Sequence, residues 1–237
     1  MVNEARAVFL EVESMSPNTI EGRCARLMNT LDSPLFSISD MDRLHNLADT
    51  NREDMFIRWM LAIQCRTHNL DEQGAHAYEI ILNAWNPGPV LVSQTFANLL
   101  SNLGQYERAL IYRQRAVELE PAGWSYQGLG ATLTYLNQPE KADAAFKRSV
   151  ELSDESTYWL TWAWSLKYRQ LYPEAINKCK KALDRDPQNW LAISIWADSL
   201  NALGQRNEAL EKYRECISLN PSYEYAYKQI STLREGR

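Results

Sequence analysis

Apolar residues recur three and four positions apart through most of this chain, which predicts amphipathic helices. The periodic stretches come in pairs, and a short turn separates the two members of each pair. Two of these turns contain glycine, in the segments Leu103-Gly104-Gln105 and Leu203-Gly204-Gln205. Glycine ends a helix readily because it adopts a positive φ without strain. The pattern therefore predicts an all-α fold built from a repeated helix–turn–helix unit.

Aligning the chain with itself shows the repeat. Three segments line up, 103–121, 172–187 and 203–221, and a fourth, 136–154, follows the same template. One small residue recurs at nearly constant spacing, as Ala109, Ala142, Ala175 and Ala209. A second small residue stands two helical turns further on, as Ala116, Ser149, Ala182 and Cys216. The template ends at Pro121, Asp154, Pro187 and Pro221 in the four segments.

Each recurring residue has a physical role in a packed helix pair. Small side chains let two helix backbones approach closely, and proline stops a helix because it lacks the amide hydrogen. This pattern resembles the tetratricopeptide-repeat (TPR) family, whose period of about 34 residues it follows. The resemblance covers about residues 53–237. It implies a right-handed α-solenoid of helix–turn–helix repeats, with an amino-terminal helical cap and a carboxyl-terminal capping helix.

The predicted domain division follows from the register of the repeats. Residues 1–52 form an amino-terminal helical cap and residues 53–237 the repeat array; a separate specificity or dimerisation element is the alternative for 1–52. The repeats are placed at about 56–89, 90–122, 123–155, 156–189 and 190–223, with a capping helix at 224–236. The first repeat is degenerate. Its second helix is registered on Ala75 with Pro87, and the alternative is Ala77 with Pro89.

Composition narrows the choice of partners and compartment. The chain has 237 residues, is 45% hydrophobic and 23% charged, and has a net charge of −5, which argues against nucleic acid or an anionic membrane as partner. Residues 1–16 lack the positive start and long apolar run of a secretory signal. No apolar run is long enough to span a membrane. Four scattered cysteines, Cys24, Cys65, Cys179 and Cys216, indicate free thiols and a cytoplasmic protein; a processed secreted form is the alternative.

No constellation in the sequence predicts catalysis, a metal site or a cofactor. The three histidines, His45, His68 and His76, lack metal-ligand spacing, and the glycine-rich stretch 123–130 lacks the lysine of a phosphate loop. Gly130 is instead explained by close helix packing. The basic cluster Lys178, Lys180, Lys181 and Arg185 is interpreted as a solvated face, with a docking patch as the alternative. Cys179 and Cys216 are interpreted as structural thiols.

The resemblance implies where a partner would bind, because the first helices of TPR units line a concave groove. In 156–170, the residues Trp159, Trp162, Ala163 and Leu166 fall on a buried stripe, and the other face carries the groove positions. The predicted partner-binding residues are Trp164, Tyr168, Lys167, Leu160, Gln127, Tyr135, Asn98, Asn102, Asp198 and Asn201. Exposed aromatic rings with amides suit an extended peptide or a helix. Packing of Trp164 against the neighbouring first helix is the alternative.

One TPR subtype holds the carboxyl terminus of heat-shock chaperones in a lysine and asparagine clamp. Asn98 matches an asparagine of that clamp, but Gln94 is neutral where a lysine is needed, and Trp164 is apolar where a basic group is expected. That co-chaperone function is therefore not predicted. The sequence predicts a non-catalytic scaffold or adaptor for a protein or peptide partner. The alternative is a self-assembling TPR protein that forms dimers or larger arrays.

Overall fold

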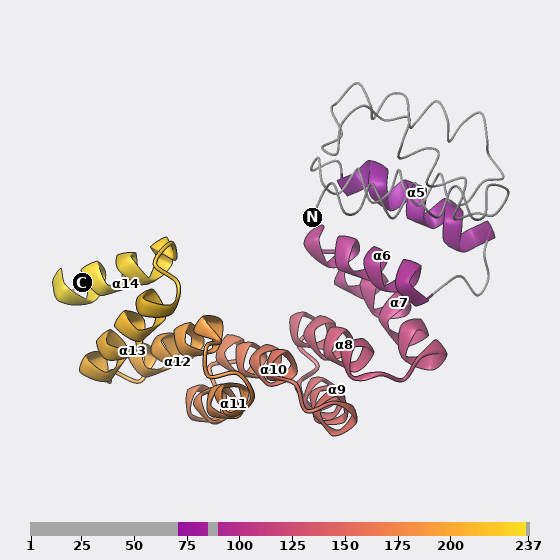
Figure 1. The fold of residues 1–237 in the computed structure, drawn as a ribbon. Helices are drawn as coiled ribbons and strands as arrows, with labels where there is room; N and C mark the ends of the chain where they lie inside the picture. The colour runs from indigo at the N-terminus through magenta and orange to yellow at the C-terminus, as the bar shows by residue number, and fades with distance from the viewer. Residues whose placement is uncertain (1–70, 85–89, 236–237) are drawn as a thin grey trace, which may run out of the picture. The chain divides into compact units, whose positions relative to one another are not determined.

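The computed structural model describes residues 71–84 and 90–235, and every regular element in these ranges is a helix (Figure 1). The chain divides into two compact units, residues 1–105 and 106–237. The predicted amino-terminal cap, residues 1–52, lies outside the described ranges. The division into domains and repeats stays a prediction.

The first unit contributes two described helices, α5 (Asp71–Ala84) and α6 (Val90–Asn102). They pack through aromatic and aliphatic side chains, and the rings of Tyr78 and Phe96 stack with their centroids 5.4 Å apart. Both rings are fully buried. Ala75 and Ala77 are both buried as well, so burial alone does not choose between the two registers of this unit.

The second unit is a succession of paired helices. Their bounds are α7 (Tyr106–Leu119), α8 (Gly123–Tyr135), α9 (Pro139–Leu152), α10 (Ser156–Tyr168), α11 (Tyr172–Arg185), α12 (Trp190–Ala202), α13 (Arg206–Leu219) and α14 (Glu224–Glu235). Each first helix packs against the second helix of its own pair, as α8 does on α9, α10 on α11 and α12 on α13. The first helices also touch one another, α10 lying between α8 and α12.

Small residues make these close approaches possible. The recurring alanines Ala109, Ala142, Ala175 and Ala209 are completely buried. Gly130 on α8 faces the ring of Phe146 on α9, and a Cβ atom added at this glycine would lie 2.9 Å from that ring. This contact confirms that close helix packing explains Gly130.

The turns inside the helix pairs share one backbone geometry. Gly104 and Gly204 have φ values of +73° and +76°, and Asn137 and Gln170 hold the equivalent positions with φ values of 52° and 63°. The amide after each of them donates to a carbonyl five residues back, for example Leu171 N to Leu166 O at 2.9 Å. These bonds satisfy carbonyls at the helix end in the Schellman pattern. The predicted glycine turns are thus confirmed, and two further turns use a polar residue instead.

Replacing Gln170 with glycine is expected to raise the free energy of unfolding by about 0.5–1 kcal/mol. A side chain in the left-handed region costs about 1–2 kcal/mol, and glycine removes that cost while giving back part of it as unfolded-state entropy. Urea unfolding followed by circular dichroism measures the change. Asn137→Gly is the matched control and should gain less, because asparagine tolerates this conformation. A loss of stability in Gln170→Gly would contradict the argument.

Two cysteines of the described ranges, Cys179 on α11 and Cys216 on α13, are free and fully buried. Burial raises the pKa of the Cys179 thiol to about 12 and that of the Cys216 thiol to about 11. Cys216 Sγ also lies 3.3 Å from the carbonyl oxygen of Trp190, to which it donates. The interpretation of both as structural thiols is confirmed.

Candidate functional site

The predicted groove positions of α8, α10 and α12 lie on helices that pack in succession, and polar side chains join the first two. Gln127 Nε2 donates to Thr161 Oγ1 at 2.7 Å and to Thr157 O at 3.2 Å. Thr134 Oγ1 and Ser165 Oγ are 2.6 Å apart and buried. These hydrogen bonds fix the spacing of α8 and α10. We call the predicted groove positions on α8, α10 and α12 the first-helix face.

An aromatic cluster occupies one part of the first-helix face. It consists of Tyr106, Tyr135, Trp164 and Tyr168 from α7, α8 and α10. The centroids of Tyr106 and Tyr135 are 4.4 Å apart, and Tyr135 lies 5.2 Å from Trp164 and 5.6 Å from Tyr168. Tyr168 is 55% exposed and Tyr135 is 39% exposed. Three predicted binding residues thus form one accessible aromatic surface, and Trp164 also contacts a ring of the neighbouring first helix.

A second group of predicted residues meets around the carboxylate of Asp198. Lys167 Nζ lies 2.6 Å from Asp198 Oδ2, while the hydroxyls of Tyr213 and Tyr225 donate to Oδ1 at 2.6 and 3.0 Å. Burial, together with the carboxylate, raises the pKa of both tyrosines. An open pocket of about 290 Å³ lies here, and Lys167, Asp198 and Asn201 are among its lining residues. We call it the Asp198 pocket.

The tyrosines of the Asp198 pocket were not predicted from the sequence. Tyr213 comes from α13 and Tyr225 from α14, whereas the prediction drew only on first helices. Their spacing along the chain carries no signal that would join them to Asp198.

The remaining predicted residues lie apart from these two groups. Gln127 is engaged with Thr157 and Thr161, and Leu160 is half-buried on α10. Asn98 and Asn102 lie on α6 in the first unit, where Asn98 is half-buried and Asn102 exposed.

On the other side of α10, lysines lie over tryptophans. Lys178 Nζ is 3.6 Å from the ring centroid of Trp162, whose indole nitrogen donates to Asp143 at 2.9 Å. Trp159 stacks on Trp162 with centroids 5.8 Å apart. Neither indole is fully buried, so the prediction of a buried stripe holds for Ala163 and Leu166 only. The prediction of a solvated face was wrong for Lys178, because its ammonium packs on the indoles.

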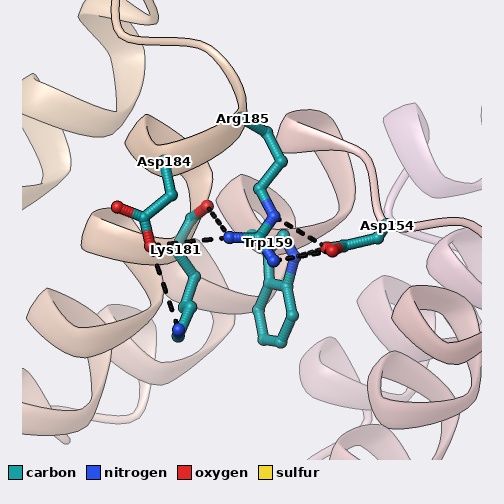
Figure 2. A network of polar contacts seen from close by, with 5 residues as sticks. All are labelled: Asp154, Trp159, Lys181, Asp184 and Arg185. Carbon is teal, nitrogen blue, oxygen red and sulfur yellow. Dashed lines mark hydrogen bonds and ion pairs between the residues drawn. The ribbon is translucent and has the colours of Figure 1, made fainter.

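Asp154, the residue that replaces proline in the repeat template, anchors a polar network (Figure 2). It accepts from the Trp159 indole nitrogen at 2.6 Å and from two guanidinium nitrogens of Arg185 at 2.9 and 2.6 Å. Arg185 also lies near Asp184, which pairs with Lys181 on the same helix. The hydrogen bonds from Arg185 and then Trp159 lower the pKa of Asp154 to about 2. The loop before α10 is thereby tied to the end of α11.

The stabilising effect of Asp154 is expected to depend on pH. Because its pKa is lowered in the folded state, its contribution is present above the unfolded value near 4 and is lost as pH falls through about 2. Asp154→Asn should therefore unfold at a lower temperature than the unaltered chain at pH 6, with the difference shrinking towards pH 2. Melting curves from pH 6 to pH 2 measure this. A pH-independent difference would contradict the assignment.

The repeats of this chain match those of known proteins. The tetratricopeptide-repeat family profile matches residues 93–122, 125–156 and 197–223. Two solved TPR proteins share the fold: YrrB, described as having an unusual peptide-binding site, and TTC0263 from Thermus thermophilus. YrrB is 20% identical with a TM-score of 0.53, over 78% of this chain and 96% of YrrB. TTC0263 is 17% identical with a TM-score of 0.63, over 76% of this chain and 98% of TTC0263. The chain is a TPR protein.

A sequence relative is known from cattle. BBS4, a BBSome complex member of Bos taurus, is 31% identical over 114 residues, which are 47% of this chain and 22% of that protein. The TPR chain thus matches about a fifth of that relative's length.

The described helices form an all-α TPR solenoid. None of the helices in the described ranges is long and apolar enough to cross a membrane. Repeats of this family serve protein–protein interaction and are typically non-catalytic, so the chain is a protein-interaction scaffold in this general sense.

Proposed function

We propose that this TPR protein holds a peptide or helical segment of a partner protein on its first-helix face. The observation that carries the proposal is the aromatic cluster, in which Tyr135 and Tyr168 are exposed and Trp164 is half-buried. Rings of this kind provide a large contact area with few rotamers to immobilise, and tyrosine and tryptophan are favoured at binding hot spots.

The polar surroundings suit a bound backbone. Tyrosine hydroxyls and amide side chains can pair with the carbonyl and amide groups that an extended peptide leaves free. Asn201 is half-buried beside the Asp198 pocket and presents such an amide. The carboxylate of Asp198 already accepts from two hydroxyls and pairs with Lys167, so we assign it to positioning these groups.

The descriptions of two similar proteins support this proposal in kind. YrrB is described as having a peptide-binding site, and BBS4 as a member of a complex. We propose in addition that the TPR chain is a non-catalytic adaptor and works in the cytoplasm; the location rests on its cysteine usage.

Replacing Trp164 and Tyr168 together with alanine is expected to weaken partner capture at least tenfold. Truncating two hot-spot rings commonly costs more than about 1 kcal/mol each, and about 1.4 kcal/mol corresponds to a factor of ten. The tagged chain is incubated with lysate, crosslinked and analysed by quantitative mass spectrometry. Helical circular dichroism should stay unchanged.

Tyr227→Ala is the matched control, because Tyr227 on α14 is 49% exposed and lies outside the aromatic cluster. Capture that is lost equally in this control, or retained in the double variant, would overturn the groove assignment. Light scattering of the purified chain tests the self-assembly alternative, which requires a mass above that of the monomer.

A further inference from the structure

The lysine-over-tryptophan contact recurs at the same place in two successive helix pairs. In the α10–α11 pair, Lys178 Nζ lies 3.6 Å from the ring centroid of Trp162. In the α12–α13 pair, Lys212 Nζ lies 4.3 Å from the ring centroid of Trp196. Trp162 and Trp196 are one repeat apart in the sequence, and so are Lys178 and Lys212. The contact therefore recurs with the repeat. In both pairs an indole ring with a lysine ammonium above it occupies this position.

The α8–α9 pair lacks both members of that contact. Leu129 stands one repeat before Trp162, and Ala145 stands one repeat before Lys178. A pocket of about 330 Å³ lies at this place. Apolar side chains from three helices line it, namely Leu110 from α7, Tyr126, Leu129 and Leu133 from α8, and Ala144 and Ala145 from α9.

The pocket lies on a different face of α8 from the aromatic cluster. Tyr126, Leu129 and Leu133 are spaced by three and four residues and therefore share one helix face. Gln127 and Thr134, which bond to α10, are about two helical turns apart and share another face. A ligand in this pocket would leave the first-helix face open.

The rim of the pocket carries a positive charge. Lys141 lines it and is exposed, and it takes part in none of the ion pairs found in the described ranges. The other polar lining residues are the neutral amides Gln114 and Gln138, and no carboxylate of the described residues lines the pocket. The charge therefore complements an anionic group placed beside an apolar one.

We propose that this pocket binds an aromatic side chain of a partner protein that has a carboxylate next to it. The ring takes the place that Trp162 and Trp196 take in the following pairs, and the carboxylate faces Lys141. This surface is additional to the first-helix face and does not depend on it.

The probe is the peptide acetyl-Gly-Trp-Asp-Gly-amide, titrated to millimolar concentration into the isotope-labelled full chain and followed by NMR. Saturable shifts are expected at Leu129, Ala144 and Ala145. The peptide with asparagine in place of aspartate should bind about two- to fivefold more weakly, which corresponds to about 0.4–1 kcal/mol and is typical of an exposed ion pair. Lys141→Ala should remove this difference. Absence of saturable shifts at these residues would overturn the proposal.

The double substitution Leu129→Trp with Ala145→Lys rebuilds the contact of the later pairs and should abolish binding. Ala144→Glu is a second test at an exposed position, where the added carboxylate repels the acidic peptide without disturbing the core. It decides the matter if the double variant does not fold, since unchanged affinity in Ala144→Glu would overturn the proposal. Trp164→Ala with Tyr168→Ala should bind the probe normally; loss of binding there would assign the probe to the first-helix face instead.

Discussion

Replacing Phe146 with alanine is expected to lower the free energy of unfolding by about 3–5 kcal/mol, the usual cost of removing a buried phenylalanine. The ring is fully buried between α8 and α9, where it faces Gly130, and it stacks on Trp162 of α10 with centroids 6.2 Å apart. Truncation removes apolar contacts and leaves a cavity. Because Gly130 and the core alanines Ala142 and Ala145 have little side chain to move, the cavity cannot be refilled easily.

Urea unfolding followed by circular dichroism measures the loss, and Phe146→Leu is the matched control. Leucine keeps most of the apolar volume and should cost less than about 2 kcal/mol. In repeat proteins each unit contacts only its neighbours, so hydrogen exchange should rise first in α8, α9 and α10. A loss well below the range expected for Phe146→Ala, no larger than that of the leucine control, would contradict this description of the core.

Replacing Asp198 with alanine is expected to lower the free energy of unfolding by roughly 2–4 kcal/mol. This is below the full penalty for a buried charge, because the Lys167–Asp198 ion pair is partly solvated. The side chains of Lys167 and Asp198 are 29% and 14% exposed. Removing the carboxylate leaves the Lys167 ammonium without its ion-pair partner and the hydroxyls of Tyr213 and Tyr225 without their acceptor. Three helices, α10, α13 and α14, then lose a shared link to α12.

Thermal and urea unfolding measure this effect, with Glu211→Ala as the control because Glu211 is an exposed acid on α13. Asp198→Asn should fall between the two, since its amide oxygen still accepts from tyrosine while the charge is gone. Equal stability of Asp198→Ala and Glu211→Ala would show that the carboxylate is not a link between helices.

The sequence predicts the fold well because the same pattern of apolar, small and turn residues recurs along the chain. Gly104 and Gly204 identify their turns, since glycine is the residue that favours a positive φ. Asn137 and Gln170 adopt the same conformation without such a signal, and only their register within the repeat places them. Local chemistry therefore predicts two turns and periodicity predicts the other two.

The candidate site was predictable where its residues follow the helical and repeat periodicity. Helical spacing within α10 places Trp164 and Tyr168 on one face, and the repeat carries that face to Tyr135 on α8. Contacts between side chains at non-equivalent positions of the repeats leave no periodic pattern in the sequence. Tyr225 reaches Asp198 from α14, and Lys178 lies over Trp162 because two helices pack at a particular depth.

The two buried thiols have a consequence for chemistry on this protein. A thiolate is the form that alkylating and oxidising reagents attack, and burial raises the pKa of Cys179 to about 12 and of Cys216 to about 11. Both thiols are also fully buried, so we expect each to react only when the packing around its helix, α11 or α13, opens to solvent. The second unit thus carries two built-in reporters of local opening, one in the α10–α11 pair and one in the α12–α13 pair.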